Sequence, residues 1–337
     1  MTIPYRTQRL MKRILILLLV LLLLALVAWT CWMLWLQRFI IYTADGNAIL
    51  DFDLPPISEG QVASKPEQET VPIHFNEGDE ESNLSTELAQ LTGYYIEPEQ
   101  LNDPTQIISQ LRVLEPGTAV MMDVKDIQGA FYYSSTVSSN YASGLDVAAI
   151  DDLITYMNNS NLYTIARLPA LRDYHYGLNH VPNGVHHSSG LYLYQDDQRC
   201  YWLNPAKGGT LTYLNQIVTE LKNLGFNEVV FYDFCYPNSD SIMVDGSKAE
   251  HLTKAAETLV KACTTDRFAL SFVKSADFTM PEGRVRMYLS DVDPADAATI
   301  AQDSGVPDPL INLVFITELY DTRFNTYSVL RPLSSAH

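Results

Sequence analysis

The sequence predicts an α/β protein, a (β/α)8 TIM barrel preceded by a single N-terminal transmembrane helix and an acidic disordered spacer. From residue 91 onward, short runs of aliphatic and aromatic residues alternate with amphipathic stretches, which is the pattern of βα units around a parallel sheet. Eight such runs can be placed, and eight is the strand number of the barrel. The roughly 245 residues after Thr92 also match the typical size of this fold, about 250 residues.

The first expected element is a membrane anchor at residues 14–36. These 23 positions carry no charged side chain, and at about 1.5 Å rise per residue a helix of this length crosses a hydrocarbon core of roughly 30 Å. The basic residues of segment 1–13 precede it and Arg38 is the only base just after it, so segment 1–13 is expected in the cytoplasm. The alternative is a cleaved signal peptide, but this run is longer than a usual h-region and ends in three tryptophans: Trp29, Trp32 and Trp35.

A spacer and a folded domain are expected after the anchor. Residues 43–85 are rich in Asp, Glu, Pro, Gly and Ser, and such a stretch buries too little apolar area to offset its ordering entropy. We therefore expect an acidic flexible spacer there and a barrel domain over residues 86–337. The predicted localisation is the cell membrane, single-pass, with a cytoplasmic N-terminus and an extracytoplasmic C-terminal domain, and the lipid bilayer is a partner through residues 14–36.

The barrel elements follow from apolar runs and helical periodicity. We expect strands at 92–96, 119–124, 163–168, 228–234, 268–273, 285–290, 312–317 and 327–330. We expect helices at 104–114, 147–158, 211–224, 248–263 and 294–303. In the third of these helices the apolar positions recur at 3.6-residue spacing, and Gly225 follows as a stop signal. The alternative is a doubly wound open sheet, but no glycine fingerprint follows an early strand.

Composition excludes several classes of function. A formal charge of -18 and a pI near 4.6 argue against nucleic acid as a partner, because phosphate binding needs clustered Lys and Arg. The cysteines show no CxxC spacing, and no cofactor motif is present. Four histidines lie within 173–198, but their spacing matches no metal-ligand pattern, so we expect a flexible loop over the barrel mouth and no metal site.

Polar residues that end the predicted strands are the candidates for chemistry, because barrel enzymes act at the carboxyl ends of their strands. The most informative is Asp233 in VVFYDFCYP, since a carboxylate in such an apolar run is unfavourable without a partner. The other strand-end candidates are Asp123, Lys125, Asp126, Arg167, Asp291, Asp293 and Glu318.

Three stretches of the chain carry a family resemblance: GTAVMMDVKDIQGAFYYSS, YTIARLPALRD and YWLNPAKGGTLTYLNQIVTELKNLGFNEVVFYDFCYP. In order and spacing they resemble the glycoside-hydrolase-like domain DUF4015, with its VIDVKD-like and IAR-like strands, W-V-N-P segment and F-D-Y-I-R-F-P-like fourth strand. The resemblance covers about residues 92–237. It departs at Cys235, where the family has an arginine shortly after its aspartate, and this loss of a planar cation favours altered specificity or a pseudoenzyme.

By analogy with barrel glycosidases, the resemblance implies two carboxyl groups that flank a glycosidic bond. Asp233 would be the nucleophile or base. Asp291 is the first candidate for the acid, Asp123 or Asp126 the second and Glu318 the third. Each of them has a structural alternative, an ion pair, for example Asp123 with Lys125 or Arg167.

Sugar recognition also uses aromatic faces and amides. The expected substrate-binding residues are Lys125, Asp126, Arg167, Trp202, Asn204, Tyr232 and Glu318. Core packing is the alternative for Trp202, and a turn before Pro205 is the alternative for Asn204.

The sequence therefore predicts a membrane-anchored glycoside hydrolase that acts on an extracytoplasmic polysaccharide or cell-envelope glycan. A carbohydrate-binding module of the same fold without catalysis is the alternative. A tethered scaffold for another protein is the third possibility.

Overall fold

The structure is a computed structural model of the chain. It describes residues 88–275 and 278–335, together with Leu22, Trp29 and two short strands, β1 (Ile40–Tyr42) and β2 (Ala48–Leu50). The chain divides into two compact units, Met1–Pro72 and Ile73–His337. In the first unit β1 and β2 pair antiparallel, so residues 48–50 form a strand inside the expected spacer.

Apart from these residues, the predicted anchor at 14–36 and the predicted spacer at 43–85 lie outside the described part of the chain. Within the described part, no helix combines the length and the apolar character that a bilayer crossing needs.

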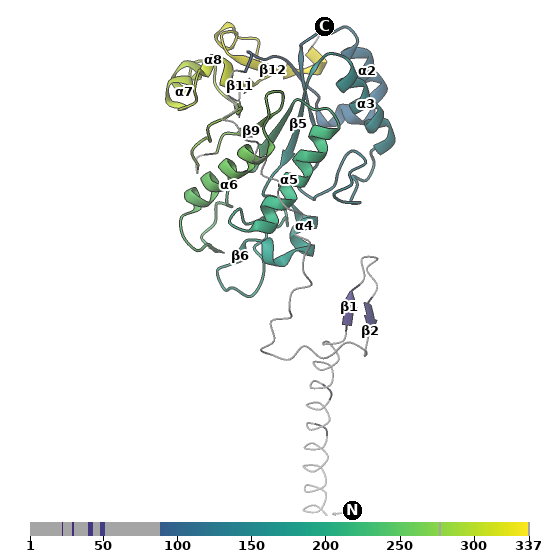
Figure 1. Ribbon diagram of the computed structural model, residues 1–337, viewed down its shortest axis with the longest axis vertical. Helices are drawn as coiled ribbons and strands as arrows, with labels where there is room; N and C mark the ends of the chain where they lie inside the picture. Colours follow the sequence, from purple (N-terminus) through teal and green to yellow (C-terminus); the bar gives the residue numbers. More distant parts are fainter. Residues whose placement is uncertain are drawn as a thin grey trace, which may run out of the picture. The chain divides into compact units, whose positions relative to one another are not determined.

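The second unit contains a closed barrel of eight parallel strands (Figure 1). In chain order they are β3 (Thr92–Tyr95), β4 (Ala119–Asp123), β5 (Tyr163–Pro169), β7 (Glu228–Tyr232), β9 (Ala269–Val273), β10 (Met287–Ser290), β11 (Leu313–Ile316) and β12 (Ser328–Pro332). Each pairs with the next along the chain, and β12 pairs with β3 to close the ring. The predicted barrel is confirmed, with each predicted strand within two residues of its observed bounds.

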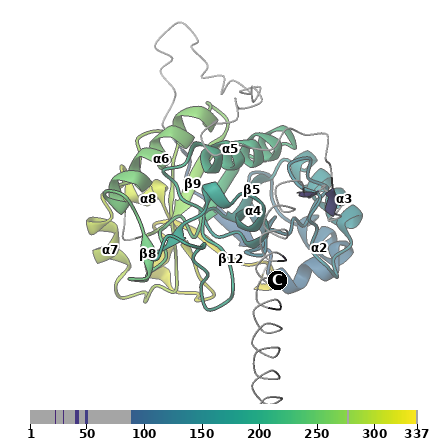
Figure 2. The same ribbon diagram turned by 90° about the horizontal axis from the view of Figure 1, so that it is seen from below.

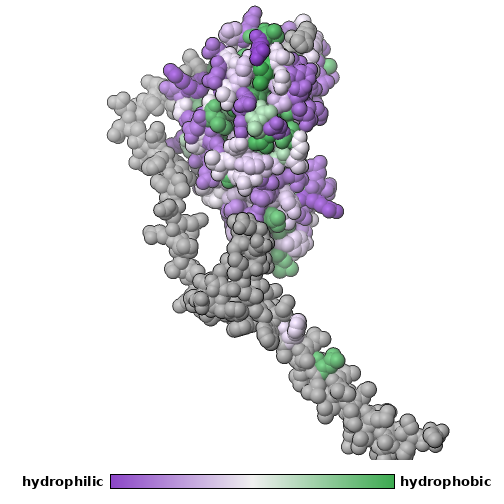
Figure 3. All heavy atoms as spheres, turned by 90° about the vertical axis from the view of Figure 1, so that its right-hand side faces the viewer, coloured by the Kyte–Doolittle hydropathy of each residue, from purple (hydrophilic) through white to green (hydrophobic). Residues whose placement is uncertain are grey.

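Helices surround the barrel, as Figure 2 shows. They are α2 (Pro104–Leu111), α3 (Val147–Asn159), α5 (Gly208–Asn223), α6 (Lys248–Cys263), α7 (Ala297–Asp303) and α8 (Pro309–Asn312). In α5 the apolar stripe predicted from the sequence is buried, and Gly225, with φ +103°, follows the end of the helix. On the face of the molecule that Figure 3 shows, most of the described surface residues are hydrophilic. This agrees with the acidic composition of the chain.

The sequence did not predict the short elements in the loops. These are α4 (Tyr174–Asn179), β6 (His186–His187), β8 (Ile242–Met243), η2 (Pro98–Asn102), η3 (Val181–Asn183), η4 (Thr322–Phe324) and η5 (Leu333–Ser335). Strand β6 pairs antiparallel with β8, so the histidine-containing segment after β5 is joined to the segment after β7. The segment therefore contains short regular elements, which the sequence did not predict.

Alternation along the strands separates the barrel interior from the helix layer. Inward positions form a small apolar cluster in mid-barrel: Leu91, Ala119, Met121, Ile165, Val230, Tyr288, Val314 and Leu330. At the amino-terminal ends of the strands the fully buried Glu228 pairs with Arg286, Nη1 to Oε2 at 2.5 Å. Further along the same strands, two residues beyond the members of this cluster and near the carboxyl ends, the inward-facing residues include Asp123, Arg167 and Tyr232. The interior is therefore polar at both ends and apolar between them.

Gly93 on β3 lies against the backbone of β4, and a Cβ added there would collide with the carbonyl of Ala119. We expect Gly93→Ala to lower the free energy of unfolding by about 1–3 kcal/mol, as overpacking of a filled core does. Urea unfolding measures this change. Gly208→Ala is the matched control, because nothing surrounds the added methyl group there. If Gly93→Ala leaves the free energy of unfolding unchanged, the backbones of β3 and β4 lie farther apart at Gly93 and Ala119 than the structure places them.

Candidate active site

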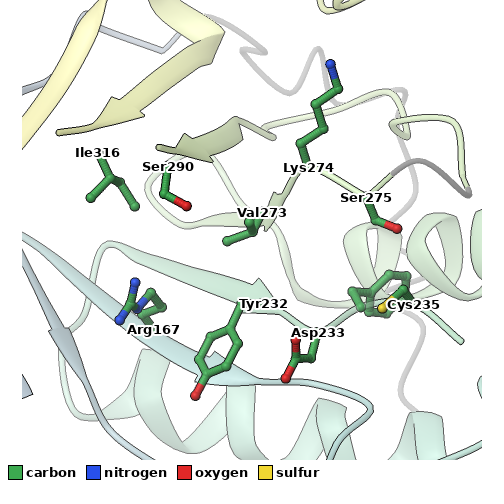
Figure 4. A pocket seen from close by; sticks show the side chains of 10 residues that line it. Arg167, Tyr232, Asp233, Cys235, Val273, Lys274, Ser275, Ser290 and Ile316 are labelled. Atoms are coloured by element: carbon green, nitrogen blue, oxygen red, sulfur yellow. The ribbon is translucent and has the colours of Figure 1, made fainter. Parts of the chain in front are cut away.

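A pocket of about 470 Å³ opens among the carboxyl ends of the barrel strands (Figure 4). Inward residues at or near the ends of five strands line it: Arg167 of β5, Tyr232 of β7, Val273 of β9, Ser290 of β10 and Ile316 of β11. Asp233, Phe234, Cys235, Lys274 and Ser275, which directly follow two of these strands, complete the lining. This is the end of the barrel at which barrel enzymes carry out their chemistry.

Two aspartates at the mouth adopt a left-handed backbone. Asp233 follows β7 with φ +50°, and Asp291 follows β10 with φ +56°. Alternation would turn the residue after Tyr232 or Ser290 toward the helices, and the left-handed conformation interrupts that alternation. Asp233 consequently lines the pocket, while Asp291 is exposed beside the pocket residue Ser290. Such strain in non-glycine residues is concentrated at functional sites.

The carboxylate of Asp233 is half-buried beside a cation that the sequence analysis did not single out. Arg172, from the segment after β5, places Nη1 3.8 Å from Asp233 Oδ2. Burial raises the pKa of Asp233, Arg172 opposes this rise, and the nearby carboxylate of Asp196 adds to it. Asp233 is therefore easier to protonate than an ordinary aspartate, yet it has a partner for its ionised form.

Asp196 holds Arg172 in place. Its Oδ2 accepts from Arg172 Nη2 at 2.6 Å and from Trp202 Nε1 at 3.0 Å. The Arg172 guanidinium lies over the Trp202 ring, 5.5 Å from its centre. Burial alone would raise the pKa of Asp196, but hydrogen bonds from the Cys200 amide and the Trp202 indole hold it below its usual value. Trp202, 8% exposed, therefore supports the arginine and presents little surface to a ligand.

Asp123 and Arg167 form a bidentate ion pair across β4 and β5. Arg167 Nε donates to Asp123 Oδ1 at 2.5 Å, and Nη2 donates to Oδ2 at 2.8 Å. Both carboxylate oxygens of Asp123 are engaged, which matches the structural alternative that the sequence left open. The guanidinium of Arg167 also lies 5.5 Å from the centre of the Tyr232 ring. Arg167 and Tyr232 thus share one wall of the pocket with Asp233 (Figure 4).

The prediction that Lys125 binds substrate is wrong, because its side chain does not reach the pocket. Its fully buried side chain pairs with Asp173 at 2.7 Å, and Tyr213 donates to the same Oδ2 at 2.8 Å. Asp173 Oδ1 in turn accepts from the amide of Tyr176 at the start of α4. Lys125 therefore ties the segment after β4 to the segment after β5, and a substrate cannot touch it.

The remaining predicted ligand-binding residues are placed differently. Asp126 Oδ1 accepts from the Ala130 amide at 2.9 Å and so shapes its own turn. Asn204 Oδ1 accepts from the Ala206 amide and from the Tyr236 hydroxyl, both at 2.9 Å, which is the turn that the sequence left as its alternative. Glu318 is exposed after β11. Its charge adds to the burial that raises the pKa of Tyr95 at the end of β3.

The sequence analysis missed Arg172 and Asp196 as members of the site. Arg172 lies within the stretch YTIARLPALRD, where a second arginine five residues after Arg167 was the available signal. No local signal marks Asp196, because only the path of the loop brings it back to the mouth. Among the residues that the structure describes, no group of His, Cys, Asp or Glu is arranged to hold a metal ion.

A closed ring of eight parallel strands with a polar pocket at its carboxyl end places this chain among the TIM-barrel proteins. Its family is DUF4015. The family model, described as "Putative glycosyl hydrolase domain", matches residues 93–279, and the chain belongs to this family.

Solved structures similar to this chain include three of interest. A hypothetical protein from Ruminiclostridium thermocellum is 20% identical with a TM-score of 0.45, over 53% of this chain and 96% of that one. The GH36 α-galactosidase AgaA from Geobacillus stearothermophilus is 10% identical with a TM-score of 0.47, over 72% and 37%. The glycoside hydrolase domain of PelA from Pseudomonas aeruginosa is 11% identical with a TM-score of 0.41, over 73% and 96%.

The chain spans only 32% to 50% of several other glycosidases that it resembles. No curated protein matches it.

Proposed function

We propose that this protein is a membrane-anchored, extracytoplasmic glycoside hydrolase that cleaves a polysaccharide or cell-envelope glycan by carboxylate acid/base chemistry. The observation that carries the proposal is the pair of left-handed aspartates, Asp233 and Asp291, at the carboxyl ends of β7 and β10. The left-handed conformation turns Asp233 into the pocket and leaves Asp291 exposed beside it, where both carboxyl groups can meet a substrate. The match to a glycosyl hydrolase family supports the same chemistry.

Asp233 takes the role of nucleophile or base and Asp291 that of acid. The acid donates its proton to the leaving glycosidic oxygen as the bond from that oxygen to the anomeric carbon breaks. Asp233 either attacks that carbon directly or removes a proton from the attacking water. Arg172, 3.8 Å from Asp233, stabilises the ionised form that either role requires. Exposed Asp291 is free to meet a leaving group that extends out of the pocket.

A reducing-sugar release screen of the purified protein on a panel of polysaccharides tests this proposal. We expect at least one glycan to be cut, and we expect Asp233→Asn to stop the cutting. Equal cutting by the variant would remove Asp233 from the mechanism.

Binding without cleavage is the second candidate function. The observation that favours it is Cys235, which lines the pocket at the position where the family resemblance implies an arginine. A glycan retained on an affinity gel by the protein, with no new reducing ends after prolonged incubation, would establish the binding function in place of hydrolysis.

The pH dependence of hydrolysis is expected to report on Asp233. As a nucleophile or base Asp233 must be ionised, so activity falls as the pH drops through its pKa, which burial raises above the ordinary value of about 3.9. Arg172→Met removes the group that lowers this pKa, so the acid limb moves to higher pH. Asp196→Asn removes a charge that raises it, so the limb moves to lower pH. Profiles of kcat/KM against pH measure both shifts, and identical acid limbs in all three proteins would exclude Asp233 as the titrating group.

The membrane anchor is also part of the proposal, and its support is the uncharged run at residues 14–36 with basic residues before it. Cell fractionation of the full chain and of a chain without residues 14–36 tests it. The full chain should sediment with membranes and become protease-sensitive from the outer side, while the shortened chain should not sediment.

A further inference from the structure

Arg167 and Tyr232 line the same wall of the pocket, and both carry hydrogen-bond donors that no described residue accepts. We call Arg167, Tyr95, Tyr132 and Tyr232 the Arg167 cluster. The centre of the Tyr232 ring lies 5.5 Å from the Arg167 guanidinium. Tyr95 packs against the inward cluster at the end of β3, beside β4, and the Tyr132 amide donates to the carbonyl of Val124 directly after β4. They come from different segments: Tyr95 from β3, Tyr132 from the segment after β4, and Tyr232 from β7.

The cluster offers donors and few acceptors. Arg167 uses Nε and Nη2 on Asp123, and no described residue accepts a hydrogen bond from its Nη1. None of the three phenol hydroxyls donates to another residue in the part of the chain that the structure describes. Burial is the first cause that raises the pKa of each phenol, so all three keep their protons through the neutral range. Their donors are available to oxygen atoms of a ligand.

The charges around the cluster select against an anion. Asp123 already neutralises Arg167, because the pair is bidentate. Asp233 lines the same pocket, and the exposed Asp291 and Glu318 follow β10 and β11 at the same end of the barrel. Lys274 also lines the pocket, but in Figure 4 its side chain points away from Arg167 and Tyr232. A ligand carboxylate would meet mostly like charge here, whereas an uncharged ligand rich in oxygen atoms would meet donors.

We propose that the Arg167 cluster is a binding subsite for one uncharged sugar residue. Asp123 is its positioning residue, which orients the guanidinium of Arg167 and cancels its charge. The Tyr232 ring beside Arg167 offers a flat face for the C–H side of the sugar. The inference rests on the proposed function, since it names the sugar class that the same pocket accepts.

Binding of monosaccharides to the full chain tests the proposal without any need for hydrolysis. The probes are D-glucose, D-galactose and N-acetyl-D-glucosamine as uncharged sugars, and D-glucuronic acid as the anionic counterpart of glucose. Titration followed by ligand-observed NMR gives each dissociation constant. We expect at least one uncharged sugar to bind, and D-glucuronate to bind at least ten-fold more weakly than D-glucose.

Variants separate recognition from folding. Tyr232→Phe is expected to weaken uncharged-sugar binding by roughly three- to ten-fold, the usual effect of losing one hydrogen bond. Tyr156→Phe on α3, outside the mouth, is the matched control and should change nothing. Asp123→Asn leaves the charge of Arg167 uncancelled, so it should weaken D-glucose and strengthen D-glucuronate. A purely structural role of Asp123 would not produce this reversal of selectivity.

The proposal is overturned if no uncharged sugar binds, if D-glucuronate binds as tightly as D-glucose, or if Asp123→Asn weakens both equally. The failure of the proposed hydrolysis gives a different result: sugars bind with the expected selectivity while no polysaccharide is cut.

Discussion

Asp233→Asn is expected to lower the turnover number for glycan hydrolysis by about 10²–10⁴-fold, the usual range for loss of an acid or base group. An amide has the shape of the carboxylate, but it can neither attack the anomeric carbon nor accept a proton from water. Asparagine is also one of the few residues that tolerates φ near +50°, so the backbone after β7 should be kept. Initial rates of reducing-sugar release, with circular dichroism as the check on folding, measure the effect.

Two comparisons sharpen this expectation. Asp240→Asn alters an exposed carboxylate in the same β7–α6 segment and should leave the rate unchanged. Asp291→Asn should also slow glycan hydrolysis, but much less for aryl glycosides whose leaving groups need no proton. If Asp291→Asn slows both kinds of substrate equally, Asp291 is not the acid. If Asp240→Asn lowers the rate of glycan hydrolysis as much as Asp233→Asn does, the cause is the reduced negative charge at the barrel mouth and not a specific role of Asp233.

Glu228→Gln is expected to lower the free energy of unfolding by about 3–5 kcal/mol, as the loss of one partner in a buried ion pair does. Glu228 is fully buried, accepts from the Tyr163 and Tyr288 hydroxyls at 2.9 Å, and pairs with Arg286, which is 1% exposed. With glutamine at position 228, the guanidinium of Arg286 is still charged and buried away from water, but it has lost its counter-ion. Urea unfolding followed by circular dichroism measures the change.

Asp321→Asn is the control for Glu228→Gln, since it breaks the exposed Asp321–Arg323 pair and should have no measurable effect. Glu228→Gln combined with Arg286→Met should be more stable than Glu228→Gln alone, because no unpaired charge then remains. A double variant as unstable as the single one would show that packing, and not the ion pair, dominates at this end of the barrel.

Local patterns in the sequence determined the barrel strands and most of the surrounding helices. Strands such as β4 are continuous apolar runs because both of their faces are buried, and helices such as α5 carry an apolar stripe at 3.6 spacing because one face is buried. These signals lie within about ten residues and need no knowledge of distant contacts. Because these signals are local, the sequence alone also predicted Asp123, Arg167 and Asp233 as strand-end residues.

Only the tertiary structure decided what these residues do at the mouth. The left-handed turn of Asp233, the placement of Arg172 by Asp196, and the burial of Lys125 against Asp173 depend on segments far apart in the chain. A lysine contributes the same hydropathy to the sequence pattern whether its side chain contacts a ligand or a buried aspartate, so the pattern cannot distinguish the two. The physical reason is that a side chain's charge, solvation and direction are set by the neighbours that the closed barrel brings together.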